Sequence, residues 1–95
     1  MKGIVWTKPS IADLSEIRNW LVTEVGRSIA VRVLGQIRQQ AEQLETFAAL
    51  GPALTATRRK MLVHKTNYVI VYRIKATSID VLRVHHVRQD WRPPE

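Results

Sequence analysis

Cysteine is absent from this chain of 95 residues, which excludes a disulfide framework and a metal site built on thiolates. Its longest apolar runs, such as YVIVY, fall far short of the roughly 20 residues that cross a bilayer. The N-terminal MKGIVW also lacks the apolar stretch of a secretory signal. We therefore expect a cytoplasmic protein with no membrane association. A chain of this length is expected to form one domain, residues 1–95, around a single core.

Acidic residues are scarce in the second half of the chain. Residues 1–50 hold six Lys/Arg and five Asp/Glu, whereas residues 51–95 hold nine Lys/Arg and three Asp/Glu. No acidic residue occurs between Thr46 and Ile79. This polarised charge points toward an acidic partner, either a nucleic acid, the ribosome or an acidic protein segment. The alternative is a soluble protein whose surface happens to be basic.

The first elements are predicted to be a short strand and a helix. GIVWTK (3–8) is β-rich and is followed by Pro9, which indicates a strand. Apolar residues then recur at steps of three and four, which predicts a helix over about 11–25. Ser10 is the expected N-cap, with Asp13 completing a capping-box-like arrangement. Gly26 suits the left-handed position after the helix.

A second helix is expected to follow almost at once. Ser28 can cap it, and Gly51-Pro52 is expected to end it. Because the connection at Gly26-Arg27 is so short, the two helices are predicted to form an antiparallel hairpin. The apolar stripe of the second helix comprises Ile29, Val33, Ile37, Ala41, Leu44 and Ala48.

Three β-type runs make up the rest of the expected fold, at 59–65, 68–75 and 79–87. Their short links favour antiparallel hairpins. Residues 68–72 are apolar on both faces, which predicts the central strand. The predicted element order is β-α-α-β-β-β: an α+β fold with a helical hairpin on a curved antiparallel sheet.

Four features together resemble the RelE/ParE superfamily of toxins from bacterial type II toxin–antitoxin modules. They are the element order and the stretches KPSIADLSEIRNWL, TRRKMLVHKTNYVIVYRI and VLRVHHVRQDW. The resemblance implies a small toxin that forms a hetero-oligomer with a cognate antitoxin. It also implies one of two activities: RelE-like members cut mRNA on the ribosome, whereas ParE-like members poison DNA gyrase. Fold alone does not choose between them.

RNA cleavage needs a proton acceptor, a cation at the phosphate and a proton donor. RelE-like nucleases typically carry an arginine two residues before the VY of the central strand, a place that Val69 takes here. The resemblance therefore lies closer to the ParE branch, with gyrase as the expected target. A RelE-like mRNA endonuclease is the alternative. Its candidate catalytic residues are Arg59, Arg83, His86 and Arg88.

Each candidate residue also has a structural interpretation. His86 can be a strand-end histidine bonded to backbone, and His85 is expected on the opposite face of the strand. The cluster Arg58-Arg59-Lys60 can bind an acidic partner, or it can discourage edge-to-edge aggregation. The expected contact residues for a target or antitoxin are Arg58, Arg59, Lys60, Arg73, Arg83, His86, Arg88 and Trp91. The expected antitoxin groove comprises Trp20, Phe47, Leu50 and Leu54. Neither a metal nor a cofactor is expected.

Overall fold

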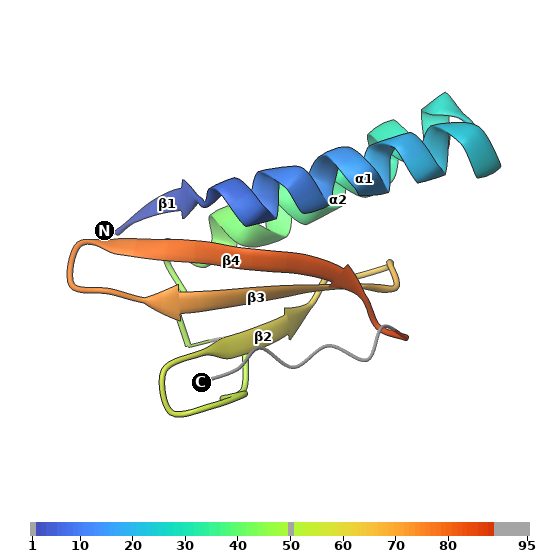
Figure 1. Cartoon of the computed structure of the whole chain (residues 1–95). Coiled ribbons are helices and arrows are strands. Elements are labelled where there is room, and N and C mark those ends of the chain that lie inside the picture. The colour runs from blue at the N-terminus through green and yellow to red at the C-terminus, as the bar shows by residue number, and fades with distance from the viewer. Residues whose placement is uncertain (1, 50, 89–95) are drawn as a thin grey trace.

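The computed structural model describes residues 2–49 and 51–88 of the chain. The described residues follow the predicted order: β1 (Gly3–Trp6), α1 (Lys8–Glu24), α2 (Arg27–Gln43), β2 (Arg59–Leu62), β3 (Tyr68–Ile74) and β4 (Ser78–His86). The two helices lie on one side of the sheet, and their connected end projects past it (Figure 1). Within these residues, no helix is long and apolar enough to cross a membrane.

The sheet is mixed, with the strand order β1-β4-β3-β2. The pairs β2–β3 and β3–β4 are antiparallel, as predicted from their short links. In contrast, β1 runs parallel to β4, from Gly3 opposite Ser78 to Trp6 opposite Val81, so the sheet is not wholly antiparallel. Since a helical hairpin separates β1 from the other strands, no short turn dictates its direction. The central position of β3 is confirmed.

The outer edge of β4 is contacted from Ser78 to Val84, although β1 covers only its first part. Beyond Val81 the register of β3 and β4 shifts by one residue, because Tyr72 faces Val81 whereas Val71 faces Arg83. In this part of β4, residues at the start of α1 contact the strand edge in place of β1. The Thr7 hydroxyl donates a hydrogen bond to the Val81 carbonyl (2.7 Å), and Asp13 accepts one from the Val84 amide (3.0 Å). The β4 backbone is thus covered against pairing with another strand as far as Val84.

The first helix begins earlier than predicted because Thr7, not Ser10, is its N-cap. The Thr7 side chain accepts a hydrogen bond from the Ser10 amide (3.4 Å), and Pro9 occupies the first turn, where its missing N–H costs nothing. Ser10 is buried inside that turn and donates to the Thr7 carbonyl (2.7 Å). Gly26 has φ 103° and its amide bonds to Leu21, as predicted for the residue after a helix.

The second helix differs from its prediction at both ends. Gly26 is its N-cap, and no side chain, Ser28 included, makes the capping bond. Its regular part ends at Gln43, eight residues before the predicted Gly51-Pro52 stop. After Gln43 the chain turns through bonds between residues three apart and then meets Tyr72. The Tyr72 hydroxyl donates to the Ala48 carbonyl (2.8 Å) and accepts from the Gly51 amide (2.9 Å), so this tertiary contact fixes the segment.

The core lies between the hairpin and the helix-facing side of the sheet. Most of the predicted stripe of the second helix is buried there, including Ile37, Ala41 and Leu44 at 0% exposure. On the first helix Leu21 is the only buried apolar side chain, while Ile11 remains 53% exposed. The sheet contributes Met61, Val63, Tyr68, Ile70, Tyr72, Ile79, Val81 and Val84.

Candidate functional site

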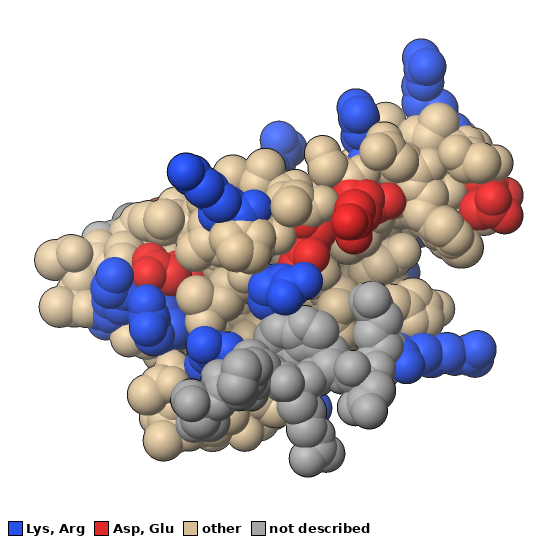
Figure 2. Space-filling model, viewed as in Figure 1, with Lys and Arg blue, Asp and Glu red and all other residues tan. Residues whose placement is uncertain are grey.

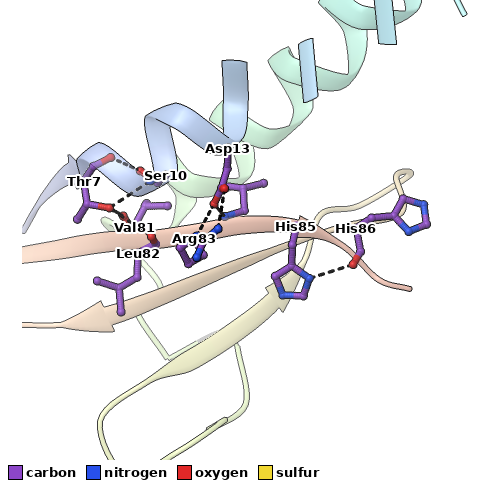
Figure 3. A network of polar contacts seen from close by, with 9 residues as sticks. Thr7, Ser10, Asp13, Val81, Leu82, Arg83, His85 and His86 are labelled. Atoms are coloured by element: carbon purple, nitrogen blue, oxygen red, sulfur yellow. Dashed lines mark hydrogen bonds and ion pairs between the residues drawn. The ribbon is translucent and has the colours of Figure 1, made fainter. Parts of the chain in front are cut away.

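Arg83, a predicted contact and candidate catalytic residue, is held by a carboxylate of the first helix. Its Nε and Nη2 donate to the two Asp13 carboxylate oxygens at 2.7 and 2.9 Å (Figure 3). Asp13 is 8% exposed and also accepts from the Val84 amide. A two-pronged pair of this kind fixes both partners. We call it the Asp13–Arg83 clamp.

The clamp assigns Asp13 a different role from the one predicted. The sequence suggested a helix cap, but its carboxylate joins α1 to β4 across 70 positions of the chain. This hydrogen bond raises the pKa of the Arg83 guanidinium; its partial burial acts in the opposite direction, and the charges of Asp13 and Glu16 add to the rise. Arg83 is therefore a permanent cation that is already neutralised by Asp13, which leaves it poorly placed to stabilise a phosphate.

A cleft of about 470 Å³ lies beside the clamp, between α1 and the end of β4. Glu16 and Trp20 line it from the helix, and Tyr68 and His86 line it from the sheet. The Tyr68 and His86 rings meet edge to face, 5.5 Å between centroids. Burial raises the pKa of the Tyr68 hydroxyl, so this phenol remains protonated at neutral pH.

The two adjacent histidines point to different sides of β4, as strand alternation predicts (Figure 3). The His85 Nδ1 donates to the His86 carbonyl (2.9 Å), which places its proton on that nitrogen. The His86 Nδ1 accepts from the Arg88 amide (3.1 Å), which leaves the proton of a neutral ring on Nε2. His86 therefore makes the backbone contact that the structural interpretation predicts.

The four candidate catalytic residues do not gather at one place. Arg59 faces Tyr72 across the β2–β3 pair, whereas His86 faces Tyr68 across the β3–β4 pair. Tyr68 and Tyr72 are four residues apart on one strand, a separation of about 13 Å. Arg59 also has a structural role, since its Nη1 donates to the Gly51 carbonyl (2.8 Å). His86 and Arg88 remain together at the exposed end of β4, and Arg83 lines the same cleft as His86.

The predicted basic residues of the second strand lie at the other end of the sheet. Arg58 is half-buried and Lys60 is exposed. Lys60 faces Val71, so it shares with Arg73 the face that lies opposite the helices. Arg73 contacts Asp80 at 3.6 Å, and Lys75 contacts the same carboxylate at 3.3 Å. Acidic groups thus interrupt the basic ones, as they also do elsewhere on the face in Figure 2.

Asp80 gives the fold a pH-dependent contribution. Burial raises the pKa of its carboxyl, but the Ser78 hydrogen bond and the Lys75 and Arg73 charges outweigh burial and lower it overall. A lowered pKa stabilises the fold above the unfolded value of about 3.9, and this stabilisation is lost as the pH falls through the folded pKa. We expect Asp80→Asn to unfold at lower urea concentration than the wild type at pH 7. The difference should shrink below about pH 4; a constant difference would contradict this account.

The three described residues of the predicted antitoxin groove do not line one groove. Trp20 lines the cleft near the connected end of the hairpin, Phe47 follows the opposite end of α2, and Leu54 lies in the loop before β2. Leu50 and the predicted contact residue Trp91 fall outside the described residues. Among the residues that are described, no three His, Cys, Asp or Glu side chains gather in a possible metal site.

An apolar groove does exist between the two helices, and the sequence did not reveal it. It has a volume of about 770 Å³, with Arg18 and Arg38 among its lining residues. A neighbouring hollow of about 530 Å³ shares Arg18 and adds Arg27. No acidic residue lines either hollow. We call the two together the hairpin groove, whose apolar lining includes Trp6, Ile11, Leu14, Val22, Val31 and Leu34.

Comparison with known proteins agrees with this architecture. The profile of the ParE toxin of the type II toxin–antitoxin system, parDE, matches residues 4–91. Toxin RelE2 of Caulobacter vibrioides is 29% identical over 86 residues, spanning 90% of this chain and 96% of that protein. A chain of the chromosomal ParDE system from P. aeruginosa superposes with a TM-score of 0.81 at 25% identity, covering 90% of this chain and 96% of the other. Since the family profile spans nearly the whole sequence, the chain belongs to the ParE toxin family of type II toxin–antitoxin systems.

Proposed function

We propose that this toxin acts by binding DNA gyrase and that it does not cleave RNA. The observation that carries the proposal is the Asp13–Arg83 clamp, which uses the guanidinium that an RNA-cleaving site would need at the phosphate. Val69 occupies the place where RelE-like nucleases carry another arginine. Of the other two candidate arginines, Arg59 supports the Gly51 loop at a distance from His86, whereas Arg88 lies beside His86. Since Asp13 already holds Arg83 and Arg59 lies elsewhere on the sheet, we do not expect an acid–base set to form around one substrate atom.

Purified gyrase provides the direct test. We expect the toxin to inhibit supercoiling of relaxed plasmid and to increase the amount of DNA cleaved by gyrase. Mixing the toxin with its antitoxin beforehand should abolish both effects. Unchanged supercoiling and cleavage at an excess of folded toxin would contradict the proposal.

We also propose that the hairpin groove receives an acidic, amphipathic helix of the cognate antitoxin. Its apolar floor suits the apolar face of such a helix, and its arginine rim suits acidic side chains along the margins. Ile11 and Val31 are 53% and 66% exposed there, so their burial by a partner would remove apolar surface from water.

Val31→Glu tests the groove without a large effect on folding, because Val31 is exposed. Burying this carboxylate against an apolar helix should weaken antitoxin binding by roughly a hundredfold or more, measured by titration calorimetry. Leu62→Glu is the matched control, since Leu62 is similarly exposed (58%) but lies on β2. Equal weakening by both substitutions would place the antitoxin elsewhere.

A second candidate function, mRNA cleavage on the ribosome, is kept because His86 and Arg88 lie together at an exposed strand end. Primer extension on ribosome-bound message distinguishes it. The gyrase proposal predicts no new cuts after toxin expression. Cuts that His86→Ala abolishes, and that the neighbouring His85→Ala retains, would favour the nuclease.

A further inference from the structure

A basic pocket lies between the loop 53–58 and the end of β3, away from the hairpin groove and from the cleft beside His86. Its volume is about 360 Å³. The loop is tight: Ala53 pairs with Arg59, and the Leu54 and Thr55 amides both donate to the Arg58 carbonyl (2.8 and 3.2 Å). We call this cavity the loop pocket. No acidic residue lines it. Its lining residues are Ala53, Thr55, Ala56, Thr57, Arg58, Arg59, Arg73 and Ile74.

Arg73 makes a weaker contact with its carboxylate, Asp80, than Arg83 makes with Asp13. In the Asp13–Arg83 clamp, two guanidinium nitrogens bond to the carboxylate at 2.7 and 2.9 Å. Arg73 approaches Asp80 at only 3.6 Å, and its buried Nε has no hydrogen-bond partner. Asp80 is shared with Lys75 at 3.3 Å. The Arg73 side chain as a whole is 43% exposed, and its contact with Asp80 is longer than a hydrogen bond, so its exposed donors retain capacity for an oxyanion.

Arg59 provides a second cation in a fixed position. The Arg59 Nη1 donates a hydrogen bond to the Gly51 carbonyl, which uses one of the five N–H donors of the guanidinium. An anchored guanidinium loses less side-chain entropy when it binds a ligand. The Thr55 and Thr57 hydroxyls complete a lining with the chemistry that binds a phosphate.

We propose that the loop pocket binds a backbone phosphate of a nucleic acid. Cations continue beyond the pocket, since Lys60 and Lys75 are exposed, and basic groups outnumber the one acidic residue, Asp80, that contacts Arg73 and Lys75 there (Figure 2). A row of cations matches the repeated charges of a polyanion better than a single carboxylate. This inference goes beyond gyrase inhibition and does not depend on it.

Binding of a short, fluorescently labelled DNA duplex to the purified toxin tests the proposal, without gyrase or antitoxin. We expect Arg58→Gln and Arg73→Gln each to weaken binding on the order of fivefold at low salt. Each should also reduce the salt slope by about one between roughly 50 and 200 mM. The control Arg32→Gln removes the same charge from an exposed site on α2 and should change the affinity by less than about twofold.

Three results would overturn the proposal. They are absence of duplex binding by the wild type, an equal loss in Arg32→Gln, and equally effective competition by a polyglutamate peptide, which would assign the pocket to acidic protein segments. Arg73→Gln also alters the Asp80 contact, so its circular dichroism must match that of the wild type. If it does not, Arg58→Gln decides alone, because Arg58 makes no ion pair with a described residue.

Discussion

Replacing Gly51 with alanine is expected to lower the free energy of unfolding by about 3–4 kcal/mol. An added Cβ would lie 2.2 Å from the Lys60 carbonyl oxygen and 2.8 Å from its carbon, and backbone atoms cannot move aside as a flexible side chain can. It would also lie 3.0 Å from the Tyr72 hydroxyl oxygen, which accepts a hydrogen bond from the Gly51 amide. Relief of the clash would therefore disturb the Tyr72 contact and the Arg59 contact with Gly51.

Gly35→Ala is the matched control for this substitution. Gly35 lies inside α2 and has no heavy atom within 4 Å of an added Cβ, so alanine should stabilise the protein by about 0.5–1 kcal/mol through helix propensity. Urea unfolding monitored by circular dichroism measures both changes. A Gly51→Ala protein as stable as the wild type would show that the segment before β2 is not packed as described.

Replacing Asp13 with asparagine is expected to destabilise the fold by about 2–3 kcal/mol. The asparagine removes the charge that neutralises Arg83 and one of the oxygens that accept its hydrogen bonds. Breaking a fully buried pair costs about 3–5 kcal/mol. The Arg83 side chain is 42% exposed, so solvent reduces that loss.

Glu16→Gln is the control for Asp13→Asn, because Glu16 lies one turn further along the same helix but is exposed. It should change stability by less than about 0.5 kcal/mol. A double-mutant cycle of Asp13→Asn with Arg83→Met separates the Asp13–Arg83 interaction from the Asp13 contact with the Val84 amide. The loss of unfolding free energy in the double variant should be smaller than the sum of the losses in the two single variants. Additive effects would mean that the clamp contributes little.

The fold follows from the sequence where neighbours along the chain decide it. Apolar spacing located both helices, and the short links around β3 determined the antiparallel pairs. The helix ends were predicted less well, because Ser10 and Thr7 are both good caps, and only contact with the Val81 carbonyl selects Thr7. The path of the chain after α2 is held by Tyr72, through contacts with Ala48 and Gly51 that no local pattern reveals.

The candidate site was less predictable because its contacts join distant parts of the chain. A basic cluster in the sequence does not indicate that Arg59 supports Gly51, or that Arg83 meets a carboxylate on the first helix. The hairpin groove likewise appears only when α1 and α2 are placed side by side. Val69, at the place where the resemblance implies an arginine in RelE-like nucleases, can be read directly from the sequence, and its meaning for function stays a prediction.

The contacts of these arginines underlie our proposal for how the toxin acts. Arg83 and Arg59 make contacts within the fold, and we propose that the exposed hairpin groove and loop pocket bind other macromolecules. Harm to the cell would then come from a trapped enzyme on DNA and not from chemistry performed by the toxin.

The amount of DNA covalently attached to gyrase, measured in cells within minutes of toxin induction, tests this claim most directly. We predict a rise that precedes growth arrest and disappears when the antitoxin is co-expressed. Growth arrest with no increase in gyrase-linked DNA would contradict the account.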